Sequence, residues 1–198
     1  QNPLEEDLAL RTIGRLAEAL EYTHSAGVFH RDIKPDNIII TRDNVPKLID
    51  FGIARIMHSR KIASTRLGTM SYMAPEVFEG ASGYPADIWS LGVTFHEMLT
   101  GIRPFDGASE GETMRAIMNA PLNLEALHKA GVDERIIGIV KRMLERDPDD
   151  RYNARDLAND IEIVARRIRL VNDDESRLEV LIRASFPCIT IISFEEDR

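Results

Sequence analysis

The chain has 198 residues, a hydrophobic content of 43% and a formal net charge of -8. This length and apolar content suffice for one globular domain with a sizeable core. The negative charge argues against nucleic-acid binding, which normally requires a basic surface. Cys188 is the only cysteine, so the sequence has no disulfide framework and no zinc spacing, and we expect a reducing, cytoplasmic location. The strongest apolar run, at 188–194, is too short to cross a bilayer, so we expect no membrane association.

The first predicted element is a helix over residues 7–25, with Gly27 as its stop signal. Its apolar residues recur at helical spacing and form one stripe: Ala9, Ile13, Leu16, Ala17 and Leu20. We interpret His24, in the last turn, as a core or capping residue rather than a ligand, because the sequence around it offers few partners.

The segment His30–Asn37 combines an acid, a cation and an amide within eight positions of the sequence. Asp32 can accept a proton, Lys34 can neutralise an anionic group, and Asn37 can bind a hard cation through its amide oxygen. These are the groups that phosphoryl transfer requires. The alternative is a solvated turn, since Pro, Asp and Asn are ordinary turn formers.

A short β-hairpin is predicted next, with strands at 38–40 and 45–49 around the turn formers at 43–44. The second strand ends in Asp50-Phe51-Gly52. This arrangement would bring the Asp50 carboxylate close to Asn37 across the hairpin, as a second ligand for a metal ion.

Residues 53–67 have no clear period and are rich in Arg, Lys, Ser and Thr, which predicts a surface loop. A short helix is predicted to open at Pro75-Glu76. The helix over 85–100 is apolar nearly all round, which is typical of the centre of a domain. Asp87 lies in its first turn, where simple capping is one interpretation.

Three further helices are predicted toward the C-terminus: from the capping box of Ser109 and Glu112 to Ala120, over 136–144, and over 157–168 after Asn153 as N-cap. Beyond residue 170 we expect an acidic break at 172–175, a weak helix at 178–184 and a strand at 189–194. No role is assigned to residues 171–198.

Three motifs in order carry a resemblance to a known family: His30-Arg31-Asp32 with Lys34 and Asn37, then Asp50-Phe51-Gly52, then Ala74-Pro75-Glu76. They resemble the catalytic loop, the metal-binding loop and the end of the activation segment of a protein kinase. The resemblance covers roughly residues 7–169 of the chain. It implies a mainly α fold with a small β-hairpin, the kinase C-terminal lobe at 1–170, and a tail at 171–198.

The resemblance also implies roles for these residues. Asp32 would orient and deprotonate a substrate hydroxyl, and Lys34 would stabilise the transferring phosphoryl group. Asn37 and Asp50 would hold Mg²⁺ against the phosphates of ATP. Ile39 would lie under the adenine ring, although an ordinary core isoleucine is an equally good interpretation without the family.

Lys34, two residues after Asp32, is the pattern of Ser/Thr kinases, and Thr69 matches the threonine that bridges the catalytic Asp and Lys. We therefore expect protein substrates with Ser or Thr acceptors. Arg31 suggests control by phosphorylation, with Thr65 as the first candidate acceptor and Ser64 as the second; unmodified hydroxyls are the alternative.

Five further residues receive structural or specificity roles from the resemblance. Glu76 and Arg151 resemble a buried ion pair that ties the activation segment to the helical core, and Asp87 would anchor the backbone of the catalytic loop. Asp36 and Glu97 match positions at which basophilic kinases bind arginines upstream of the phosphoacceptor. Glu97 could equally serve helix packing.

A complete kinase carries a Gly-rich loop, a strand lysine and a helix glutamate before this region, and none is present in the printed sequence. We expect this chain by itself to bind ATP poorly and to have little or no activity. The intact motifs favour a Ser/Thr kinase that lacks its N-terminal lobe. The competing interpretation is a non-catalytic scaffold or regulatory module.

Overall fold

The computed structural model describes the chain at residues 3–51 and 70–185, and its side chains up to residue 170. The loop predicted over 53–67, with Ser64 and Thr65, therefore lies outside the described residues, as do Thr69 and the strand predicted at 189–194.

Helix α4, at Tyr84–Thr100, is the central element of the fold. Most of its side chains from Asp87 to Leu99 are buried, including Trp89 and Phe95, which are fully buried. Gly92 lets α7, the helix at Glu134–Met143, approach closely, since a Cβ at this position would lie 2.9 Å from the Cβ of Met143. Gly101 ends the helix in a left-handed conformation at φ 76°. The predicted central helix is confirmed.

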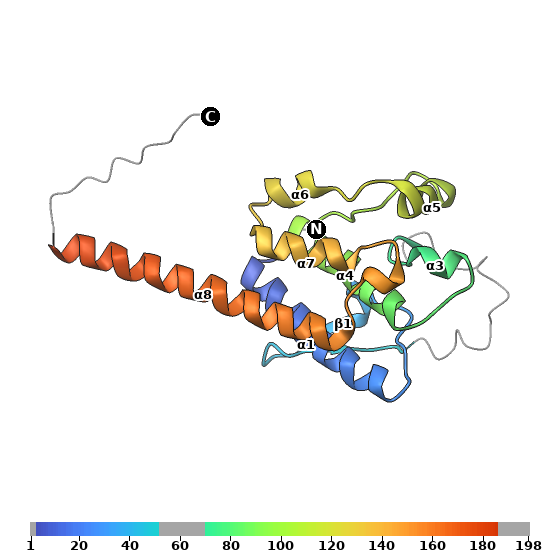
Figure 1. Ribbon diagram of the computed structural model, residues 1–198, viewed down its shortest axis with the longest axis horizontal. Coiled ribbons are helices and arrows are strands. Elements are labelled where there is room, and N and C mark those ends of the chain that lie inside the picture. Colours follow the sequence, from blue (N-terminus) through green and yellow to red (C-terminus); the bar gives the residue numbers. More distant parts are fainter. Residues whose placement is uncertain (1–2, 52–69, 186–198) are drawn as a thin grey trace.

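Helix α1, at Glu6–Ser25, packs against α4 and along the first part of α8, the helix at Ala154–Ser185. The predicted apolar stripe of α1 is fully buried. Figure 1 shows α1 and α8 lying against each other below α7, with the hairpin beside α1. Two contacts set their register: Arg155 Nε donates to Glu21 Oε1 at 2.6 Å, and Gly14 faces Ile161.

The remaining helices confirm most of the predicted elements. They are α3 at Pro75–Phe78, α5 at Glu110–Asn119, α6 at Leu124–Lys129 and α7 at Glu134–Met143, with a 3-10 turn, η4, at Pro148–Asp150. Ser109 caps α5 as predicted, since its Oγ accepts from the Glu112 amide at 3.3 Å; the Glu112 carboxylate accepts from the amide of Ala108, one residue before the N-cap, at 2.9 Å. The short helix α6 was not predicted, because six residues are too few to display a helical period.

The predicted hairpin consists of β1 at Ile38–Ile40 and β2 at Pro46–Leu48, paired antiparallel with Ile38 opposite Leu48. A 3-10 turn, η1, at Pro35–Asn37 leads into it. The hairpin packs on α1 through β2. It thus connects segment 30–37 directly to residues 49–51.

Helix α8 runs over Ala154–Ser185. Asn153 caps it as predicted, because its Oδ1 accepts from the Asp156 amide at 2.9 Å. The predicted acidic break at 172–175 is wrong, because the helix continues through it and extends beyond the other helices in Figure 1. Residues 171–185 contain neither Gly nor Pro, so acidic composition alone does not end the helix.

The described part of the chain is thus mainly helical with one two-stranded antiparallel sheet, and the predicted fold class is confirmed. Among the described residues, no helix combines the length and the apolar character needed to span a bilayer.

Candidate active site

Asp87, in the first turn of α4, holds the backbone at the start of segment 30–37. Its carboxylate accepts from the amides of His30 and Arg31, each at 2.8 Å, and its side chain is almost fully buried. The N-cap of α4 is Gly83, without a side-chain cap. The carboxylate therefore binds the polar segment rather than capping its own helix, and the simple-capping interpretation is wrong.

His24 is a third partner of Asp87. Its Nε2 lies 2.9 Å from Asp87 Oδ2, and its side chain is only 9% exposed. The ring packs against Phe29 and Tyr84. The sequence interpretation missed this contact, because the partner is 63 positions away and local periodicity says nothing about it.

Segment 30–37 brings its charged and amide side chains together around Asp32. Lys34 Nζ donates to Asp32 Oδ2 at 3.1 Å, and Asn37 Nδ2 donates to the same oxygen at 3.0 Å and to the Asp32 carbonyl at 2.6 Å. Asn37 is buried, and the side chains of Lys34 and Asp32 are 17% and 20% exposed. The acid, cation and amide of the sequence motif therefore form one contiguous group.

His30 links this group to the end of the hairpin. Its Nδ1 accepts from the Asp32 amide at 3.3 Å, and its Nε2 donates to the Ile49 carbonyl at 3.0 Å. Burial lowers the pKa of His30 below its ordinary value, so the neutral ring fits this pattern, with one acceptor and one donor nitrogen.

The backbone on both sides of Ile49 is fixed next to Asp50. The Ile49 amide donates to the Asn37 carbonyl at 3.0 Å, while its carbonyl accepts from His30. Asp50 follows directly and is exposed. Asp50 is thus one residue away from a backbone contact with Asn37 across the hairpin; that the two side chains share a metal ion stays a prediction.

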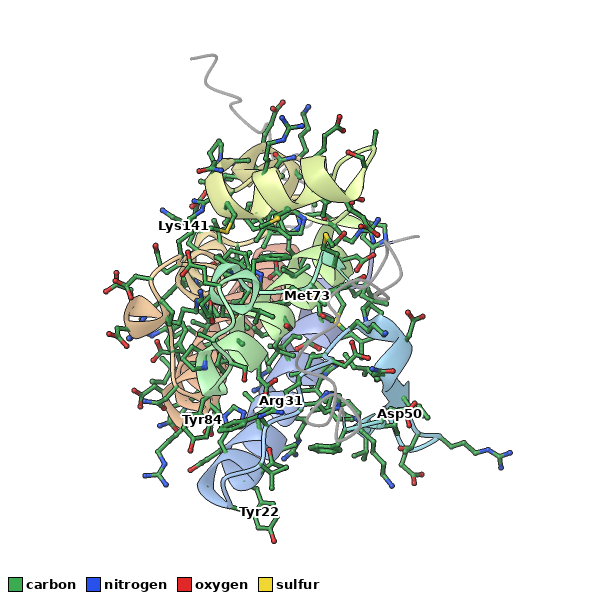
Figure 2. All side chains as sticks on the ribbon, turned by 90° about the vertical axis from the view of Figure 1, so that its right-hand side faces the viewer. Tyr22, Arg31, Asp50, Met73, Tyr84 and Lys141 are labelled. Carbon is green, nitrogen blue, oxygen red and sulfur yellow. The ribbon has the colours of Figure 1, made fainter. Side chains whose placement is uncertain are left out.

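Two residues at this site have a left-handed backbone, Arg31 at φ 67° and Asp50 at φ 56°. This conformation is unfavourable for residues with a Cβ, by about 1–2 kcal/mol each. Hydrogen bonds to the neighbouring backbone stabilise both positions: from Asp87 at Arg31, and from His30 and Asn37 before Asp50. Figure 2 views this end of the molecule, with Arg31 between Tyr84 and Asp50.

Ile39, on β1, is 48% exposed. A large aliphatic side chain at this exposure is not part of the core, so the ordinary core interpretation is wrong. The structure leaves its side chain accessible to a ligand or to another part of a protein.

The turn at 70–73 holds two carboxylates from α4 and the loop that follows it. Tyr72 donates its hydroxyl to Glu97 Oε2 at 2.5 Å, and Ser71 Oγ donates to Asp106 Oδ1 at 3.2 Å. Both hydroxyl-bearing residues are buried. Tyr72 and Ser71 were not identified from the sequence, because their partners lie 25 and 35 positions away.

Glu76 and Arg151 form a buried ion pair with two parallel hydrogen bonds, at 2.7 and 2.8 Å. The Arg151 guanidinium also donates to the carbonyls of Pro85, Glu145 and Arg146, and it lies over the Trp89 ring at 5.0 Å. All five N–H groups of the guanidinium therefore have acceptors. The pair ties α3 to α4 and to the loop after α7.

The site lies on a mainly helical fold with a small hairpin, as the resemblance to protein kinases implied. The comparisons with known proteins agree: the family model for the protein kinase domain matches residues 1–161. The chain belongs to the protein kinase family.

Its relatives among characterised proteins are named as serine/threonine kinases. PknH of Mycobacterium tuberculosis (strain CDC 1551 / Oshkosh) is 35% identical over 185 residues, which cover 92% of this chain and 29% of PknH. Cds1 of Schizosaccharomyces pombe is 39% identical over 147 residues, covering 70% of this chain and 32% of cds1.

Among solved structures, the crystal structure of Rad53 1-466 in complex with AMP-PNP superposes with a TM-score of 0.69 at 30% identity. The match covers 79% of this chain and 40% of that one. The chain spans about a third of the length of the relatives named above, 29% for PknH and 32% for cds1.

Proposed function

We propose that the protein transfers the γ-phosphate of ATP to Ser or Thr hydroxyls of protein substrates. One observation carries the proposal: Asp32, Lys34 and Asn37 form a single hydrogen-bonded group, and Ile49, the residue before Asp50, bonds Asn37 across the hairpin. The family and the named activity of the relatives support the same reaction.

Asp32 is the proposed general base, which orients the acceptor hydroxyl and takes its proton. Lys34, 3.1 Å from Asp32 Oδ2, supplies the cation that stabilises charge on the transferring phosphoryl group. Thr69, outside the described residues, is proposed to bridge Asp32 and Lys34. Ile39 is proposed to contact the adenine, since its exposed side chain offers an apolar surface.

Asn37 and Asp50 are the proposed ligands of Mg²⁺. Both hydrogen bonds of the Asn37 amide leave from Nδ2, so its Oδ1 oxygen is the atom suited to a hard cation. Among the described residues no group of three or more His, Cys, Asp or Glu side chains forms a metal site. A two-ligand set fits Mg²⁺, which commonly binds one or two protein ligands together with substrate phosphates. Bound Mg²⁺ would neutralise charge on those phosphates.

Two further proposals concern control and substrate choice. Arg31 is the proposed partner of a phosphate on Thr65 or Ser64, because a guanidinium can bind a phosphate through paired hydrogen bonds. Asp36 and Glu97 are the proposed acceptors for a basic side chain upstream of the acceptor hydroxyl. Asp36 is exposed and lies four positions after Asp32 in the sequence.

A transfer assay tests the function. The protein encoded by its complete gene is incubated with Mg²⁺, ATP labelled at the γ-phosphate and a peptide library, followed by phosphoamino-acid analysis. Label on Ser and Thr is expected, and Mg-ATP should raise the thermal unfolding midpoint. Label only on Tyr would overturn the acceptor class, and neither transfer nor a midpoint shift would favour the scaffold function instead.

A further inference from the structure

Three carboxylates, here called the acidic cluster, come from η1, from α4 and from the loop after α4: Asp36, Glu97 and Asp106. Adjacent buried residues fix two of them, since Tyr72 bonds Glu97 and Ser71 bonds Asp106. Met73, the next residue, lies above Arg31 in Figure 2 and marks the turn at 70–73.

Arg103 places a guanidinium in the acidic cluster. Its Nη2 donates to Asp106 Oδ2 at 2.5 Å, and the two side chains are 27% and 44% exposed. Burial and the bond to Glu97 raise the pKa of Tyr72; the positive charge of Arg103 opposes this rise and the negative charge of Asp36 adds to it. Arg103 thus pairs with Asp106, which is bonded to Ser71, next in the chain to Tyr72 with its partner Glu97.

We propose that Arg103 is a specificity-determining residue that weakens the preference for basic substrates by supplying the acidic cluster with a cation of its own. The inference rests on the proposed function. A substrate arginine would bring the same chemical group that Arg103 already contributes. With three carboxylates and one internal guanidinium, the cluster keeps a net negative charge, so it still attracts a substrate cation but less strongly than the carboxylates alone.

Two substitutions with opposite expected effects test this role. Arg103→Gln removes the internal cation and keeps a polar side chain of similar reach, so it should raise the preference for a basic peptide. Asp106→Asn removes one negative charge and the fixed partner of Arg103, so it should lower that preference. A purely structural role would reduce activity in both variants without this difference in sign.

The measurement is the ratio of kcat/KM for two peptides that share one Ser acceptor and differ by Arg or Ala at upstream positions. For Arg103→Gln the ratio should rise about threefold to tenfold, as expected for removing one partly screened charge near the binding group. Asp106→Asn should lower the ratio, and Arg103→Lys, which keeps the charge, should leave it within about twofold.

Arg15→Gln is the matched control. Arg15 pairs with Glu18 at 2.9 Å with the same three-residue spacing as Arg103 and Asp106, but on the surface of α1. The Arg15→Gln substitution should leave the ratio unchanged.

An unchanged or lower ratio in Arg103→Gln would overturn the inference. Transfer to both peptides in the same experiment would still support the proposed function. If Arg103→Gln failed to fold, an unchanged or higher ratio in Asp106→Asn would overturn it. Loss of transfer to both peptides in the unaltered protein would count against the proposed function itself.

Discussion

Replacement of Glu76 by Gln should destabilise the protein by about 3–5 kcal/mol, the usual cost of removing one partner of a buried ion pair. The Arg151 side chain is fully buried and that of Glu76 is 13% exposed, so solvent cannot replace the lost charge. The neutral amide of Gln can still accept one hydrogen bond. The penalty therefore arises chiefly from leaving the guanidinium without its counter-charge.

Thermal unfolding of the protein encoded by its complete gene measures the effect. A loss of about 3 kcal/mol should lower the midpoint by roughly 6–12 °C for a domain of this size. Glu21→Gln is the matched control, since Glu21 pairs with Arg155 at 2.6 Å with side chains 36% and 73% exposed. Exposed pairs contribute about 0–1 kcal/mol. An equal, small effect of both substitutions would refute the role given to the buried pair.

Other substitutions and conditions test the rest of the site. Asp87→Asn should cost about 1–3 kcal/mol and lower kcat, because its amide group cannot accept from both backbone N–H groups; unchanged kcat would contradict the anchoring role. Burial lowers the pKa values of His30 and His96 below the ordinary 6.5. Stability should therefore be full above pH 6.5 and decline as the pH falls below it, because the unfolded chain binds protons more readily. Denaturant titrations should show a shallower acid decline in His96→Gln, and an identical decline would contradict this. Gly92→Ala should destabilise by about 1–3 kcal/mol through its clash with Met143, measured by thermal unfolding; a neutral effect would mean that α4 and α7 separate readily.

Local sequence patterns predicted most of the helices and the hairpin. The apolar stripes of α1 and α7 and the N-cap of Ser109 are contained within a few turns of chain, so periodicity and capping residues identify them. The six-residue helix α6 shows no period. The composition of 172–175 indicated a break, yet without Gly or Pro the chain continues as α8.

The candidate site was predictable only in part, because some of its contacts join residues close in the sequence and others join residues far apart. Asp32, Lys34 and Asn37 lie within one turn and its 3-10 extension, and their types already indicated their chemistry. The contact of His24 with Asp87 and that of Tyr72 with Glu97 join distant segments. No local pattern encodes such contacts, and the packing of α1 and the turn at 70–73 around α4 creates them.

Replacement of Asp32 by Asn tests the central claim most directly. The substitution removes the proposed base and keeps the size of the side chain, so transfer of γ-phosphate to Ser or Thr peptides should fall by at least about 100-fold, within the range of general-base catalysis. The midpoint shift caused by Mg-ATP should be preserved. Asp43→Asn, in the exposed hairpin turn, should leave transfer unchanged. Full activity of Asp32→Asn would contradict the catalytic role of Asp32.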